Sequence, residues 1–170
     1  MNIGSNALKR LVYIALACAL AQSFALEVDA AKPAVNATIS AQDAARAQAL
    51  LQRAVAFYKE VKDLALAHFG PQGEFVDDEL YVYVLSTKGV LLASGGKTSS
   101  VLGTNGADQQ DAVGKRFIRE MLDKARTQGS GTVEYHWLNP ASNKTERKVA
   151  YFQKVGDRII VVSYYPGANP

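Results

Sequence analysis

One stretch in the C-terminal half places anion-binding residue types at the spacing of β-strands. It reads Tyr135-His136-Trp137-Leu138-Asn139-Pro140, and after a turn Glu146-Arg147-Lys148-Val149-Ala150-Tyr151. Alternate residues of a strand share a face, so Tyr135 and Trp137 lie together. A buried tyrosine hydroxyl and an indole N–H need hydrogen-bond acceptors, and a bound carboxylate would supply them. Lys148 would supply the positive charge that such an anion requires once it has lost its water. The stretch therefore predicts a small pocket for a carboxylate.

Each candidate pocket residue also has a structural interpretation. Lys148 is opposite in parity to Val149 and Tyr151, so it either faces the ligand while they face a helix, or lies in solvent as most lysines do. Core packing alone would account for Tyr135 and Trp137. We add Tyr83 and Phe117 as candidate pocket residues, although strand and helix cores routinely contain such side chains.

Catalytic and metal-binding patterns are not found. Gly95-Gly96-Lys97-Thr98 resembles a phosphate-binding loop, but the first glycine of that motif would fall at Leu91. His68 and His136 belong to no metal-spaced motif, and no serine has an adjacent base that would activate it. We predict a protein that is not an enzyme and holds no metal or cofactor. The alternative is that the protein is an enzyme, a hydrolase or lyase whose acid/base pair the sequence does not reveal.

The N-terminus has the features of an export signal. Lys9 and Arg10 precede an apolar run over residues 11–21, and Ser23-Phe24-Ala25 offers small residues where a signal peptidase cuts. We predict a signal peptide over residues 1–25 and a periplasmic or secreted mature protein. A second cleavage point follows Ala30. Retention as a membrane anchor is the alternative, but the run is short for a span of about 20 residues.

Charge and cysteine content limit the partners of the mature chain. The sequence has 19 Lys and Arg against 16 Asp and Glu, a net charge of +3, and cleavage of the signal would lower it to +1. No basic stretch with interleaved aromatics indicates a nucleic-acid partner. The only cysteine, Cys18, lies within the signal, so a cleaved chain would have no disulfide and no thiolate chemistry.

Helical and strand patterns alternate along the rest of the chain. Residues 26–39 have no clear period and are predicted to be a linker. One amphipathic helix is predicted over residues 40–69 and a second over residues 111–128, with Asp111 as its cap. Strands are predicted near 80–85, 90–94, 131–138, 145–155 and 158–165. Their hairpin-length connections favour a five-stranded antiparallel sheet with helices packed on its faces, an α+β arrangement.

A series of short segments also forms an ordered set. They are Tyr81-Val82-Tyr83-Val84-Leu85, Gly89-Val90-Leu91-Leu92-Ala93, Asn105, Asp108, Asp111-Ala112-Val113-Gly114-Lys115, Phe117, Gly129-Ser130-Gly131-Thr132-Val133-Glu134-Tyr135-His136-Trp137, Lys148-Val149-Ala150-Tyr151 and Tyr164. In this order the chain from about Ala67 to Tyr165 resembles the single-Cache type 2 domains, extracytoplasmic sensor modules with a PAS-like sheet. The resemblance implies one Cache domain, which we place over residues 40–166.

The resemblance implies reversible binding of a small molecule, often a short organic acid, between the sheet and the loop and helix that cover it. Members are usually fused to a membrane span and a signalling output. Here only five residues follow Tyr165, so we expect any signal to pass to a separate protein. Relatives often have histidine where this chain has Ser94, which implies a different ligand preference. The alternative function is an interaction module, in which the long helix pairs with a second copy or a membrane sensor.

Overall fold

The computed structural model describes residues 40–77, 79–96 and 101–167. The predicted signal peptide, both cleavage points and the predicted linker lie outside these residues. A helix over residues 40–61 leads into the 3-10 turn η1 (Lys62–Leu64) and the short helix α2 (Ala65–His68). The remaining elements are β1 (Val76–Asp77), β2 (Leu80–Ser86), β3 (Leu91–Ser94), α3 (Phe117–Gln128), β4 (Ser130–Asn139), β5 (Lys144–Val155) and β6 (Arg158–Tyr164). No helix in the described ranges is long and apolar enough to cross a membrane.

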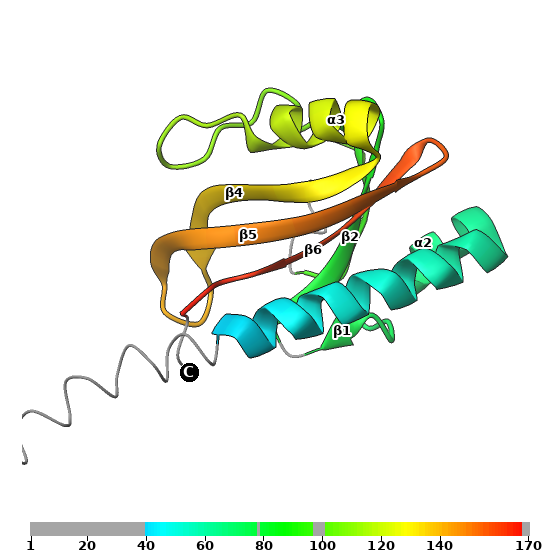
Figure 1. The fold of residues 1–170 in the computed structure, drawn as a ribbon, viewed down its shortest axis with the longest axis horizontal. Coiled ribbons are helices and arrows are strands. Elements are labelled where there is room, and N and C mark those ends of the chain that lie inside the picture. The colour runs from blue at the N-terminus through cyan, green and yellow to red at the C-terminus, as the bar shows by residue number, and fades with distance from the viewer. Residues whose placement is uncertain (1–39, 78, 97–100, 168–170) are drawn as a thin grey trace, which may run out of the picture. The chain divides into compact units, whose positions relative to one another are not determined.

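The strands form one antiparallel sheet, as the short connections predict. Its order is β1-β2-β6-β5-β4, and β3 pairs with β2 beside this path. Figure 1 shows the sheet as the middle layer, with α3 and its preceding loop on one face and the helix over residues 40–61 on the other. The predicted α+β class and antiparallel sheet are confirmed. The sheet has six strands rather than five, because the two-residue strand β1 adds to β2 through Val76 and Asp77.

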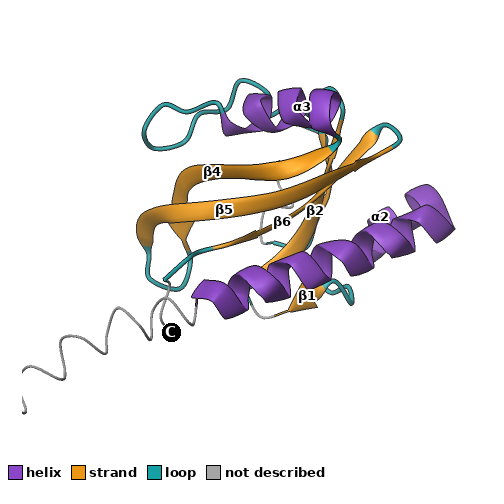
Figure 2. Cartoon of the chain, in the orientation of Figure 1, coloured by secondary structure: helices purple, strands orange, loops and turns teal. Residues whose placement is uncertain are grey.

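The face toward the long helix is packed with apolar side chains. The helix over residues 40–61 buries the stripe that its periodicity predicts, and alternate strand residues meet it. The buried members of this helix-side core include Leu50, Leu51, Ala54, Val55, Tyr58, Val82, Val84, Val149, Ile160 and Val162. The opposite face holds a second core, in which α3 packs on the other set of alternate residues. Its buried members include Tyr83, Leu85, Phe117, Met121, Val133, Tyr135, Phe152 and Val161. Figure 2 shows the helices on either side of the strands.

Both helices are shorter than predicted. The first bends at Lys62, whose φ of 54° is left-handed, and the chain then continues as η1 and α2. Asp63 fixes this bend, because its carboxylate accepts hydrogen bonds from the Tyr58 hydroxyl at 2.8 Å and from Arg158 Nη2 at 2.8 Å. The second helix begins at Phe117 rather than at residue 111, because residues before it form turns in which Gly114 has a φ of 82°.

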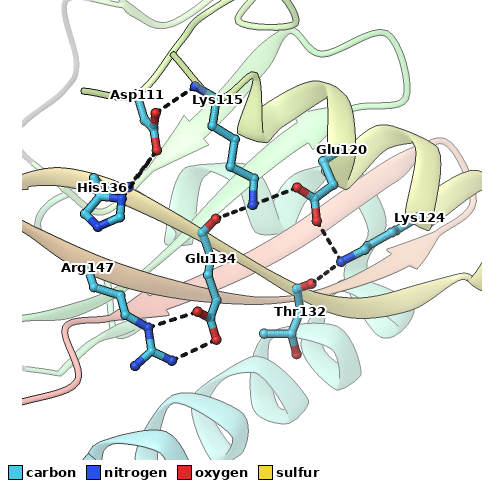
Figure 3. A network of polar contacts seen from close by, with 8 residues as sticks. All are labelled: Asp111, Lys115, Glu120, Lys124, Thr132, Glu134, His136 and Arg147. Atoms are coloured by element: carbon cyan, nitrogen blue, oxygen red, sulfur yellow. Dashed lines mark hydrogen bonds and ion pairs between the residues drawn. The ribbon is translucent and has the colours of Figure 1, made fainter. Parts of the chain in front are cut away.

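Strand β4 is the edge of the sheet, and side chains cover the backbone groups on its outer side. Lys115 Nζ donates to the Glu134 carbonyl at 2.6 Å, and Lys124 Nζ donates to the Thr132 carbonyl at 2.8 Å. Glu120 lies between the two ammonium groups, 2.8 Å from each (Figure 3). These contacts connect α3 and the segment before it to β4. They therefore help to hold the upper layer over the sheet.

Candidate functional site

A cavity of about 370 Å³ lies between the sheet and the layer formed by α3 and its preceding loop. It has contributions from β2, β3, β4, β5, α3 and residues of the loop between β3 and α3. All of the predicted site residues line it, namely Tyr83, Phe117, Tyr135, Trp137 and Lys148. The sequence therefore predicted a set of side chains that the fold brings to one place.

Strand register places the lysine beside the tyrosine. Tyr135 on β4 is directly opposite Lys148 on β5, so their side chains stand on the same face of the sheet. Val149 and Tyr151 point to the other face and pack in or against the helix-side core. Of the two interpretations of Lys148, the structure has the one in which the lysine faces the cavity. Its side chain is not solvated, since the residue is only 4% exposed.

The Lys148 ammonium is surrounded by tyrosines rather than by acids. Its Nζ lies 3.5 Å from the Tyr81 hydroxyl, 5.3 Å from the centroid of the same ring and 4.5 Å from the centroid of the Tyr165 ring. No carboxylate of the described residues lies within ion-pair distance, and Glu79 acts only at longer range. Burial lowers the pKa of Lys148 to about 8 because it penalises the charged form.

Neighbouring hydroxyl groups are poorly satisfied. The Tyr135 hydroxyl lies 3.4 Å from Ser163 Oγ, longer than a good O–H···O hydrogen bond of about 2.7–2.8 Å. The buried Tyr83 hydroxyl has no partner of acceptable geometry in the described part of the chain, although Tyr135 and Ser163 are close enough to influence it. Burial raises the pKa of Tyr83 to about 12 and that of Tyr135 well above its usual value, so both stay protonated donors at neutral pH.

Aromatic rings cover this group of donors. Phe117, the first residue of α3, stacks on Tyr135 with ring centroids 4.2 Å apart and an interplanar angle of 8°. Trp137 meets Phe117 edge to face at 5.4 Å. The start of α3 is thereby fixed over β4, and the stacked Phe117 ring helps to bury Tyr135. Electrostatic interactions are stronger in a buried environment.

Asp111 is a second link between the upper layer and β4, and it does not cap α3 as predicted. Its carboxylate accepts hydrogen bonds from the backbone N–H groups of Val113 at 3.0 Å, Lys115 at 2.8 Å and His136 at 2.8 Å. Figure 3 shows the bonds from Lys115 and His136. Burial alone would raise its pKa, but the three donors outweigh this effect and lower it. His136 lies between the cavity residues Tyr135 and Trp137, so Asp111 ties the loop to the strand that forms the wall.

Part of the cavity lining was not predicted from the sequence. Tyr81 and Leu85 both line it and share the parity of Tyr83, which was the available signal. Ser94, noted only for its difference from relatives, is buried in the lining, and its Oγ accepts the Gly96 N–H at 3.2 Å. Within the described ranges no cluster of histidine, cysteine and acidic residues could hold a metal ion.

Sequence and structure comparisons agree on the kind of domain. The profile of the Single Cache domain 2 family matches residues 28–164. A methyl-accepting chemotaxis protein from Vibrio parahaemolyticus has a TM-score of 0.62 at 17% identity, over 76% of this chain and 93% of that one. A Cache chemosensory domain described for its carboxylic acid recognition also gives 0.62 at 17% identity, over 75% of this chain and 96% of that one.

A periplasmic sensor domain of a chemotaxis protein gives a TM-score of 0.57 at 18% identity, covering 78% of this chain and 96% of that one. At these identities the structural likeness shows a common fold. No protein of curated function matches the sequence.

Proposed function

The chain belongs to the single Cache domain 2 family, and from this premise we propose that it is an exported sensor domain that reversibly binds a small carboxylate in the cavity beside Lys148. The family is one of sensory modules. Lys148, Tyr135 and Trp137 would be the main contacts, with Tyr83 and Phe117 completing the site.

The observation that carries this proposal is a buried ammonium group without an acidic partner in the described part of the chain. A buried charge is costly unless it is paired, so the site favours a ligand that brings the opposite charge. A carboxylate offers two oxygens that only accept hydrogen bonds. The donors facing the cavity include Lys148 Nζ and the hydroxyls of Tyr81, Tyr83 and Tyr135, and the bonds that these four make in the described part of the chain are long or lacking. Charge and hydrogen-bonding capacity thus both favour a carboxylate.

Thermal unfolding with added ligands tests the proposal. We expect millimolar acetate, propionate, pyruvate, lactate or a longer monocarboxylate such as hexanoate to raise the melting temperature, because a ligand that binds only the folded state stabilises it. The shift should disappear in Lys148→Met and persist in Lys154→Met, which removes an exposed lysine from the same strand. No shift with any carboxylate would contradict the proposal.

Export and onward signalling are part of the same proposal. Cleavage after Ala25 would release a periplasmic or secreted domain, and sequencing the N-terminus of the mature protein should then begin at Leu26. A ligand signal would pass to a separate protein, either a membrane sensor or a second copy, through the exposed side of the helix over residues 40–61. Light scattering at several concentrations, with and without ligand, tests this step. A protein that stays monomeric at every concentration and captures no membrane protein in a pull-down would contradict it.

A further inference from the structure

We propose that the ligand is an amphipathic monocarboxylate whose apolar body is larger than that of a two- or three-carbon acid. This inference rests on the proposed carboxylate function and adds the chemistry of the rest of the ligand. Three features of the cavity support it: the distribution of polar and apolar groups along its walls, its size, and the charge of its described lining.

The residues of β2 that face the cavity change from polar to apolar along the strand. Tyr81 lies beside the Lys148 ammonium, Tyr83 has the buried hydroxyl without a partner, and Leu85 is aliphatic and fully buried. The step from Tyr81 to Leu85 spans about 13 Å at the rise of a β-strand. A ligand with its carboxylate at Lys148 would therefore direct its other end toward an apolar wall.

Strand β3 repeats the same gradient beside β2. Ser94 is opposite Tyr83, and Leu91 is opposite Leu85. Two polar side chains of the loop next to Leu91 are bonded to backbone carbonyls, since Thr104 Oγ1 donates to the Val101 carbonyl at 2.6 Å and Asn105 Nδ2 donates to the carbonyl of Lys88, in the turn between β2 and β3, at 3.0 Å. These hydroxyl and amide groups do not require a polar ligand at this end.

The size of the cavity exceeds that of a very short acid. At about 30 Å³ for each water molecule, a volume of about 370 Å³ corresponds to about a dozen waters. Acetate would occupy only a small part of this space. A ligand with an extended apolar body would bury its surface against Leu85, Leu91 and Ile118, and each buried methylene group contributes favourably to binding.

The charge of the lining limits the ligand to one carboxylate. Among the described residues that line the cavity, Lys148 alone has a formal charge. A second carboxylate at the apolar end would lose its hydration without gaining a cation. A cationic ligand could use the aromatic rings, but it would be repelled by the protonated lysine. The lining therefore favours monocarboxylates over dicarboxylates and over amines.

Calorimetric titration of the whole domain with acetate, butyrate, hexanoate and octanoate tests the inference. We expect the Kd to fall by about fourfold for each added methylene until the cavity is filled, so that hexanoate, with four more methylenes than acetate, binds about 250-fold more tightly. Adipate has the chain length of hexanoate with a second carboxylate, and it should bind more than about tenfold more weakly. Choline serves as the cationic probe and should not bind.

Two variants of Leu91 test the apolar end directly. Leu91→Phe shortens the cavity and should weaken hexanoate about tenfold more than acetate, whereas Leu91→Ala should move the optimum toward octanoate. The melting temperature of each ligand-free variant reports whether it has folded. If binding depends on Lys148 but acetate or adipate binds as tightly as hexanoate, this inference is overturned and the proposed carboxylate function is retained. Failure of every carboxylate to bind would overturn both.

Discussion

The two faces of the sheet are built from the same strands but satisfy their polar groups differently. On the helix side, β2 and β6 contribute Val82, Val84, Ile160 and Val162, and the Tyr58 hydroxyl at the margin makes a 2.8 Å hydrogen bond to Asp63. On the cavity side, Lys148 and Tyr135 have contacts of 3.4–3.5 Å, and Tyr83 has none of acceptable geometry in the described chain.

This difference indicates that stability and binding are divided between the faces. The helix side gains mainly from apolar burial, and the Tyr58 hydrogen bond adds to it, so both favour the folded state. The cavity side retains a desolvated cation and donors without good acceptors, which oppose folding in the absence of a ligand. Truncation of an apolar side chain on the helix side and replacement of the desolvated lysine on the cavity side should therefore change the free energy of unfolding in opposite directions.

The largest effect is expected on the helix side. Ile160→Ala removes a fully buried side chain and should lower the free energy of unfolding by about 2–5 kcal/mol, through lost burial and the cavity it leaves. Urea denaturation measures this change. The preference among carboxylates should be unaltered, because Ile160 packs toward the long helix. Altered ligand preference would contradict the separation of the two faces.

Lys148→Met should have the opposite effect on stability. The lowering of the Lys148 pKa from 10.5 to about 8 corresponds to about 3 kcal/mol of unfavourable burial of the charged form at neutral pH. Replacement by an apolar side chain of similar shape should raise the free energy of unfolding by about this amount and abolish carboxylate binding. In Lys154→Met, the exposed control on the same strand, stability should change by less than about 0.5 kcal/mol. Equal effects of the two substitutions would contradict the assignment.

The same lysine should make stability and binding depend on pH. Because its pKa is about 8 in the folded state and higher in the unfolded state, the unfolded chain binds more protons between pH 8 and 10, and stability rises with pH in this range. The excess stability of Lys148→Met over the parent should thus shrink by about 2 kcal/mol between pH 7 and pH 10. Carboxylate affinity should fall about tenfold per pH unit above pH 8, because the neutral amine does not attract an anion.

The smallest effects come from a matched pair of tyrosines. Tyr58→Phe removes a hydroxyl with a 2.8 Å hydrogen bond and should lower the free energy of unfolding by about 1 kcal/mol. Tyr83→Phe removes a buried hydroxyl without a good partner, so stability should stay the same or rise slightly. Only Tyr83→Phe should weaken carboxylate binding, by about fivefold to tenfold. A loss of stability in Tyr83→Phe equal to that in Tyr58→Phe would show that its hydroxyl is bonded.

Patterns of period two and of helical spacing were sufficient for most of the fold. Alternation along residues 131–138 predicted that Tyr135 and Trp137 share a face, and parity along residues 145–155 separated Lys148 from Tyr151. The strand β1 was not predicted, because a strand of only two residues beside acidic neighbours is too short to show an alternation of apolar and polar side chains. The start of the second helix was less predictable, since Asp111 has the residue type and position of a cap but is used in a loop.

The candidate site was predictable as far as strand parity extends. The layer over the cavity was not, because residues 101–116 have no regular pattern and their position depends on contacts between segments far apart in the sequence. Asp111 illustrates this limit. Its partner His136 lies 25 residues away, and only the folded chain brings its backbone N–H to the Asp111 carboxylate.

The lysines along β4 also bear on how molecules of this protein behave at high concentration. An exposed edge strand can recruit a strand from another molecule and start the growth of fibres. Here Lys115 and Lys124 already occupy the carbonyls of Glu134 and Thr132, and Glu120 holds both ammonium groups in place. An incoming strand would have to displace ion-paired lysines before it formed its first hydrogen bonds. The sheet therefore ends at β4 and resists extension into aggregates.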